Sequence, residues 1–131
     1  MNRLVTFATA ALTALSMGAP VLAQDNAALG VWQPDNDSDY TVSNCGTKGD
    51  RFCLTVTELR GGMRKPENLK YVGKNLITEA KASGKNSWKG KIDFFGVTGD
   101  ATVTLKNANT LHLKACAYVV VCKEITLKRK S

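Results

Sequence analysis

Four cysteines are the residues whose type and spacing point most clearly to chemistry. They are Cys45, Cys53, Cys116 and Cys122, with seven residues between the first two and five between the last two. Structural zinc sites usually use C-x-x-C spacing or histidine partners, and the chain has a single histidine. Catalytic redox pairs also favour C-x-x-C. The spacing therefore favours structural disulfides, for which four cysteines allow three connectivities.

The alternation of side chains favours one of these connectivities. Cys53 alternates with the apolar Leu54, and Cys45 lies on the strand face opposite Tyr40. Residues 46–50 read Gly-Thr-Lys-Gly-Asp, a strong turn signal. A hairpin with this turn would place Cys45 across from Cys53 on its outer face, so we predict that these two cysteines pair.

The second pair of cysteines obeys the same parity. Cys116 lies on the face opposite Leu113, and Cys122 lies on the face opposite Ile125. If the chain between them ran straight, their sulfurs would be about 20 Å apart, which is beyond disulfide reach. We therefore predict a reversal within 117–121 and a Cys116–Cys122 bond. Each short loop closed by a disulfide stabilises the fold by about 2–3 kcal/mol.

Other candidate catalytic and metal-binding residues are few. His112 alternates outward on a strand, and no nucleophile or orienting carboxylate is spaced to accompany it. Asp35, Asp37 and Asp39 share one loop with calcium-type ligands, but the glycine and distal glutamate of a twelve-residue calcium loop are missing. We read that loop as a solvated turn. The sequence therefore predicts no enzyme activity, no metal and no cofactor.

The first 23 residues have the three-part layout of a secretory signal. Arg3 is the only charge before Asp25, and an apolar run from Leu4 to Met17 is broken by glycine and proline before Val21-Leu22-Ala23. A membrane anchor is the alternative, but a spanning helix needs about 20 apolar residues. We predict a signal peptide over 1–23, a mature chain over 24–131 without a transmembrane anchor, and export to the bacterial periplasm or beyond.

The charge balance limits the partners of the chain. Its 131 residues carry 18 Lys and Arg against 11 Asp and Glu, a net charge of +7 that falls to +6 without Arg3. The cations are spread along the chain, and aromatic residues make up only 7%. Nucleic-acid binding would require a basic stripe with stacking aromatics, so it is not expected. We instead expect a loose attraction to anionic envelope polymers or membrane surfaces.

A period of two runs through the mature chain and indicates β-strands separated by short turns. We predict a single all-β domain over 24–131, an antiparallel up-and-down barrel of about eight short strands, with a β-sandwich as the alternative. Residues 60–68 and 96–100 are read as a loop and a turn. The predicted strands are Ala27–Gln33, Tyr40–Asn44, Phe52–Leu59, Asn75–Ala82 (strand or helix), Trp88–Phe95, Ala101–Lys106, Thr110–Cys116 and Val120–Lys128.

The apolar face of these strands defines the candidate interior of the barrel. Its members would fill the interior or line a small apolar ligand bound in the barrel mouth. They are Tyr40, Val42, Leu54, Val56, Ile92, Phe94, Val103, Leu105, Leu111 and Leu113.

Gly30-Val31-Trp32, near the start of the mature chain, resembles the G-x-W of the first strand of lipocalins and other calycin barrels. In that family the tryptophan closes one end of the barrel, and a basic residue from the last strand lies across its ring as a cation–π contact. Arg129 shares the inward parity of Ile125 and Leu127. The resemblance therefore implies that Trp32 and Arg129 form the barrel-closing pair.

A second resemblance covers most of the mature chain. One order is followed by Gly30-Val31-Trp32, Cys45-Gly46 leading to Cys53, Leu59, Gly73-Lys74, Trp88-Lys89-Gly90-Lys91-Ile92 and Leu111 to Cys116. This order resembles the small exported bacterial proteins grouped as domain of unknown function 2147. The resemblance implies a secreted small β-domain. It implies no particular function, because that family has no agreed activity. The chain departs from it where many members have a T-W-T-R-like last strand, because Leu127 replaces the aromatic residue.

These observations predict a non-catalytic exported binding module for a small apolar or envelope ligand. The alternative is an envelope interaction protein that binds an anionic polymer, a membrane surface or a partner protein through its basic outer face.

Overall fold

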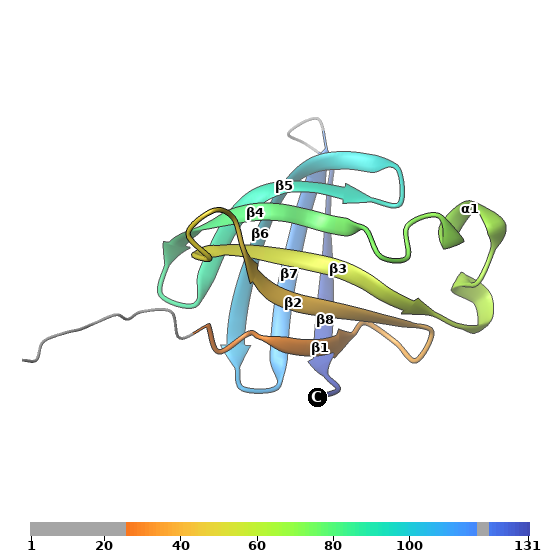
Figure 1. The fold of residues 1–131 in the computed structure, drawn as a ribbon, viewed down its shortest axis with the longest axis horizontal. Helices are drawn as coiled ribbons and strands as arrows, with labels where there is room; N and C mark the ends of the chain where they lie inside the picture. Colours follow the sequence, from red (N-terminus) through yellow and green to blue (C-terminus); the bar gives the residue numbers. More distant parts are fainter. Residues whose placement is uncertain (1–25, 118–120) are drawn as a thin grey trace, which may run out of the picture.

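The computed structural model describes residues 26–117 and 121–131. Within them, eight strands form a closed antiparallel barrel in which each strand pairs with its neighbour in the chain (Figure 1). The predicted up-and-down barrel is confirmed, and the sandwich is excluded. The predicted signal peptide, 1–23, lies outside the described residues. The strands are β1 Gly30–Gln33, β2 Ser38–Cys45, β3 Arg51–Leu59, β4 Asn75–Gly84, β5 Ser87–Phe94, β6 Val97–Asn107, β7 Thr110–Ala117 and β8 Val121–Arg129.

Three segments differ from the sequence prediction. The first predicted strand, Ala27–Gln33, begins only at Gly30, because residues 27 and 28 form a turn. The predicted loop 60–68 contains a 3-10 turn, η3, over Gly61–Met63 and a one-turn helix, α1, over Pro66–Leu69. The predicted turn over 96–100 is wrong, because β6 already begins at Val97. The reversal is made by Phe95 and Gly96 alone, both at positive φ. Two-residue turns of this kind match the twist of the flanking strands, so the alternation continues through Thr98 and Asp100.

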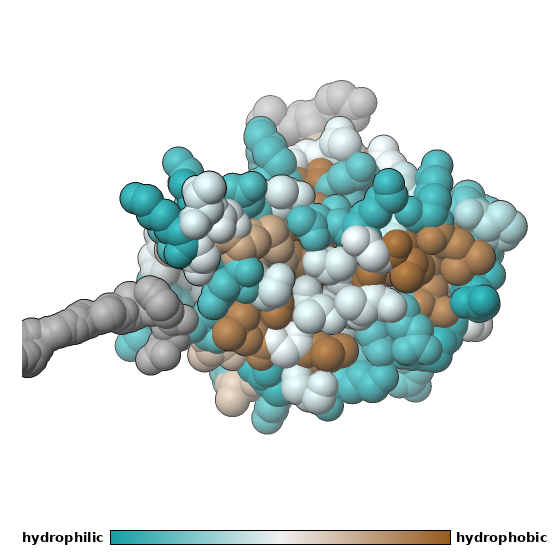
Figure 2. All heavy atoms as spheres, in the orientation of Figure 1, coloured by the Kyte–Doolittle hydropathy of each residue, from teal (hydrophilic) through white to brown (hydrophobic). Residues whose placement is uncertain are grey.

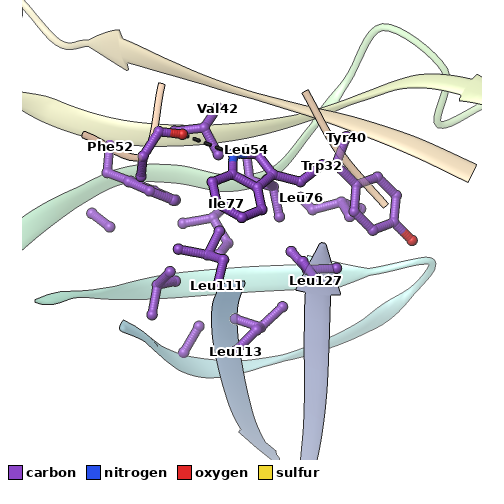
Figure 3. Close-up of a cluster of buried hydrophobic side chains, with 14 of the residues drawn as sticks. Trp32, Tyr40, Val42, Phe52, Leu54, Leu76, Ile77, Leu111, Leu113 and Leu127 are labelled. Atoms are coloured by element: carbon purple, nitrogen blue, oxygen red, sulfur yellow. Dashed lines mark hydrogen bonds between the residues drawn. The ribbon is translucent and has the colours of Figure 1, made fainter. Parts of the chain in front are cut away.

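The barrel interior is a packed apolar core (Figure 3). Nine of the ten predicted interior residues are at most 7% exposed, and the tenth, Phe94, is partly buried against the core. Large side chains from every part of the sheet point toward one another there. Further core members are Trp32, Phe52, Leu59, Leu76, Ile77, Trp88 and Leu127.

The up-and-down order of the strands gives the barrel two distinct ends. The β1–β2, β3–β4 and β5–β6 connections lie at one end, where β7 also ends and β8 begins. We call this end the mouth. The β2–β3, β4–β5 and β6–β7 turns lie at the opposite end with residues 26–29, and we call that end the base.

Candidate ligand site at the mouth of the barrel

The base of the barrel is closed by Trp32 and Arg129. The guanidinium of Arg129 lies 4.4 Å from the centroid of the Trp32 ring. It also donates hydrogen bonds to the carbonyl oxygens of Ala27, Leu29 and Ala108, at 2.6, 2.8 and 2.7 Å. The predicted pair is thus present, and it ties the chain entering the barrel to the β6–β7 turn.

Trp32 is fixed by burial and by a hydrogen bond of its own. Its side chain is fully buried, and its indole Nε1 donates to the carbonyl of Ala28 at 2.8 Å (Figure 3). A buried indole needs such a partner, because an unpaired buried donor is costly. With the base closed in this way, the mouth is the end at which the interior can meet a ligand.

Both predicted disulfides are present, Cys45–Cys53 and Cys116–Cys122. The first differs in register from the prediction, because Cys45 lies opposite Arg51 and Cys53 opposite Ser43, so the bond runs diagonally between β2 and β3. Its Cα atoms are 6.0 Å apart. Cys116 lies directly opposite Cys122, which confirms the reversal between β7 and β8; residues 118–120 themselves lie outside the described residues. Two disulfides are compatible with an exported protein.

An apolar pocket of about 230 Å³ opens at the mouth. It lies between the ends of β5, β6, β7 and β8. Of the ten predicted interior residues, Ile92 and Phe94 reach this pocket, and the others belong to the packed core below it. The lining residues are Ile92, Phe94, Val97, Thr98, Gly99, Ala115, Cys116, Ala117, Val121, Cys122, Lys123 and Ile125.

Small side chains on β6 and β7 create the space. Gly99, Ala115 and Ala117 follow the same inward parity as the larger residues that fill the core below them. Gly99 cannot be enlarged in place, since a Cβ there would lie 2.2 Å from the carbonyl oxygen of Cys116. The pocket wall therefore depends on close contact between the β6 and β7 backbones.

The rim of the pocket combines exposed apolar side chains with one cation. Val97 and Val121 are each 62% exposed. Lys123, on β8, is the one charged residue that lines the pocket.

Figure 2 shows how hydrophobic residues gather on the side of the molecule that carries α1. Tyr71, Phe94 and Phe95 pack edge to face there, with ring centroids 5.2–5.3 Å apart.

A second hollow, of about 490 Å³, adjoins the pocket on the outer face of β4, β5 and β6. Six of its ten lining residues are polar or charged, among them Asn75, Thr78 and Thr98. An ion pair between Lys91 and Asp100 crosses it. Because this hollow is an open surface depression with three charged side chains in its lining, Lys91, Asp93 and Asp100, it offers less than the mouth pocket for holding an apolar ligand.

His112 points outward, as its parity predicts. Its Nε2 lies 2.9 Å from Oε1 of Glu124 on the neighbouring β8, and both side chains reach solvent. Such a cross-strand pair on an outer sheet face links two strands.

The sequence predicts Asp39 in a solvated turn, but the side chain is buried. Its side chain is only 7% exposed on the outer face of β2. It accepts hydrogen bonds from Arg60 at 2.8 Å, Lys130 at 2.7 Å and Gln33 at 2.8 Å. The hydrogen bond from Arg60 holds the pKa of this carboxyl well below its usual range, against the opposing effect of burial. Asp39 therefore joins β1, β2, β3 and the end of β8.

We expect Asp39→Asn to lower the free energy of unfolding by about 1–2 kcal/mol at pH 7, because Arg60 and Lys130 then face a neutral partner. The loss is modest because both cations are partly exposed and water screens their attraction to Asp39. A carboxyl with a depressed folded-state pKa stabilises above its unfolded pKa of about 3.9 and loses that effect as pH falls. Urea unfolding between pH 7 and pH 2 should therefore show the variant and the wild type converging below about pH 4. A difference that persists undiminished at pH 2 would contradict the ion-pair account.

Comparison with known proteins found no family model, no curated protein and no solved structure that matches this chain. The resemblances to calycin barrels and to domain of unknown function 2147 therefore stay predictions. In residues 26–117 and 121–131, no helix is long and apolar enough to cross a membrane.

Proposed function

We propose that this chain is a non-catalytic binding module whose mouth pocket takes the apolar end of an anionic amphiphile, such as a fatty acid. The observation that carries the proposal is the pocket between β5 and β8, whose lining is apolar apart from a threonine and Lys123. Ligand sites combine a mainly apolar concave surface with a few polar groups that fix orientation. An acyl chain would enter between Ile92, Ala115 and Ile125, with its carboxylate at the rim near Lys123.

The volume of the pocket limits how much of the ligand enters. At about 230 Å³ it lies below the ~300–1,000 Å³ of sites that enclose a drug-sized ligand. The proposed ligand is therefore buried at one end only. Lys123 is exposed, and exposed charge pairs contribute only ~0–1 kcal/mol. Apolar contact supplies most of the affinity, and the cation selects an acid over a neutral alcohol.

Export to the bacterial periplasm or beyond belongs to the same proposal. It is supported by the layout of residues 1–23 and by the two disulfides, which persist in oxidising compartments. An exported barrel with a half-open apolar pocket would meet lipids and their hydrolysis products in the cell envelope.

The test is a fluorescence titration of the oxidised protein with dansyl-undecanoic acid. With the wild type, the fluorescence of the probe should rise to saturation. Ala115→Leu should weaken the affinity for the probe about tenfold, because the added side chain fills the pocket. Lys123→Gln should weaken the affinity a few-fold. Lys106→Gln, which removes an exposed lysine near the base, should leave the affinity unchanged. If the wild type gives no rise, or if Ala115→Leu binds equally well, the pocket is not the site.

A second candidate function, docking on an anionic membrane surface, is favoured by the β3–β4 loop. Residues 64–74 contain Arg64, Lys65, Lys70 and Lys74 against a single acid, Glu67. Leu69 and Val72 in the same loop are 38% and 40% exposed. Cations near an anionic bilayer contribute about 1 kcal/mol each, and exposed apolar side chains can enter its interface. This loop lies beside the mouth, so membrane contact and ligand uptake are compatible.

Co-sedimentation with vesicles tests this second function. Phosphatidylglycerol-containing vesicles should retain the protein at low salt, and phosphatidylcholine vesicles should not. Binding should fall steeply with added salt, and Lys70→Glu together with Lys74→Glu should abolish it. Retention that is independent of salt, or equal on both kinds of vesicle, would count against the basic loop as a docking surface.

A further inference from the structure

One edge of β8 is almost without a partner in the part of the chain that the structure describes. β7 pairs with β8 in unbroken register from Val121 to Lys128. On the other side, β1 has only four residues and reaches β8 only at Lys128 and Arg129. Within residues 26–117 and 121–131, the stretch 121–127 is therefore paired on one side only.

The register shows which backbone groups face this open edge. The Cα atoms of Cys116 and Cys122 are 4.0 Å apart, the close spacing of a pair that is not hydrogen-bonded. In such a pair the N–H and C=O groups point away from the partner strand. Since the β7–β8 register has no bulge, Glu124 and Thr126 share this arrangement with Cys122.

The far end of β8 has the same alternation. The N–H of Arg129 donates to the carbonyl of Asn109 at 3.1 Å, toward β7, whereas the N–H of Lys130 donates to the carbonyl of Val31 at 2.7 Å, toward β1. Counting back from Lys130, the even-numbered residues turn their backbone groups away from β7. Cys122, Glu124 and Thr126 thus present backbone donors and acceptors toward the open edge.

The open edge borders the mouth pocket. Cys122, Glu124 and Thr126 are exposed, and the alternate residues Val121, Lys123 and Ile125 line the pocket. When an extended peptide adds to a sheet edge, main-chain hydrogen bonds give affinity and pockets for alternate side chains give specificity. Both parts of that arrangement are present at this edge.

We propose that residues 121–127 of β8 accept an extended segment of a partner protein by strand addition, and that this segment alternates apolar and acidic side chains. Charge selects this occupant. The chain carries a net charge of +7. Lys123 lies within the edge and Lys128 directly follows it, and the one acid of the edge, Glu124, already contacts His112. A second copy would bring the same cations to the edge, whereas an acidic segment neutralises them. This surface is additional to the small-ligand pocket.

Amide hydrogen exchange followed by NMR tests the open edge itself. The amides of Cys122, Glu124 and Thr126 should exchange much faster than those of Lys123, Ile125 and Leu127, which donate to β7. Equal protection of the two sets would overturn the assignment of the free backbone groups, and with it the proposal.

The binding test uses a fluorescein-labelled peptide of alternating valine and glutamate, long enough to pair with residues 122–126. The fluorescence anisotropy of the peptide should rise when wild-type protein is added. The bound peptide should also shift the amide resonances of residues 122–126. Thr126→Pro removes one outward N–H without removing a bond to β7 and should weaken binding at least tenfold, whereas Thr126→Val should not. A peptide N-methylated on its pairing edge provides a control on unmodified protein. The proposal fails if the wild type does not bind millimolar peptide, if the N-methylated peptide binds equally, or if folded Thr126→Pro binds equally.

Discussion

Replacing Trp32 with alanine is expected to lower the free energy of unfolding by about 3–5 kcal/mol, measured by urea denaturation. The side chain is fully buried at the base of the barrel. Its loss leaves a cavity, leaves the carbonyl of Ala28 without its indole donor and removes the ring beneath Arg129. A loss below about 1 kcal/mol would show that the base does not depend on this residue.

A double-mutant cycle separates the arginine contact from the burial of the ring. Arg129→Ala alone should destabilise by about 2–3 kcal/mol, because it breaks charge-assisted bonds to three backbone carbonyls. Arg129→Lys keeps the charge but cannot make the three bonds together, so it should recover only part of that loss. The coupling between positions 32 and 129 should be about 0.5–1 kcal/mol, the size of a cation–π contact.

Removing the Cys45–Cys53 disulfide with two alanines should have the second-largest effect, a loss of about 3–4 kcal/mol. The short loop itself accounts for about 2–3 kcal/mol. Cys53 is also only 3% exposed, and its sulfur accepts the backbone N–H of Glu79 at 3.3 Å. Glu79 has a positive φ at an irregularity of β4, so its N–H would lose its partner at a strained position.

The second disulfide provides a matched comparison. Cys116–Cys122 closes a loop of similar length, but Cys122 is exposed and Cys116 half-buried. Its replacement by two alanines should cost only the loop contribution, about 2 kcal/mol. Thermal and urea unfolding of the two double variants in parallel should rank Cys45–Cys53 as the more stabilising. The reverse ranking would contradict the burial argument.

Much of the fold follows from alternation along the chain. The period of two gave the barrel and its interior, and the parity of the cysteines gave both disulfides. Parity also placed Arg129 on the inward face of the last strand, where the calycin resemblance assigns it to Trp32. These features were predictable because the side-chain direction along a strand has a fixed period, so one buried face determines every second residue.

A ligand in the barrel mouth was among the predictions, but most of the pocket lining and the Asp39 ion pairs were not predicted, for different reasons. A pocket depends on what is missing, and its signal was the run of small inward residues Gly99, Ala115 and Ala117, which apolar patterning does not weigh. Asp39 is buried by Arg60 and Lys130, which approach from distant parts of the sequence. Spacing within a single loop carries no information about such partners.

The central claim is that the mouth pocket is the ligand site, and a crystal structure of the oxidised protein grown with dodecanoate tests it most directly. The account predicts electron density for an acyl chain between Ile92, Ala115 and Ile125, with the carboxylate near Lys123. An empty pocket with dodecanoate bound instead along the β3–β4 loop or the outer face of β4–β6 would contradict it.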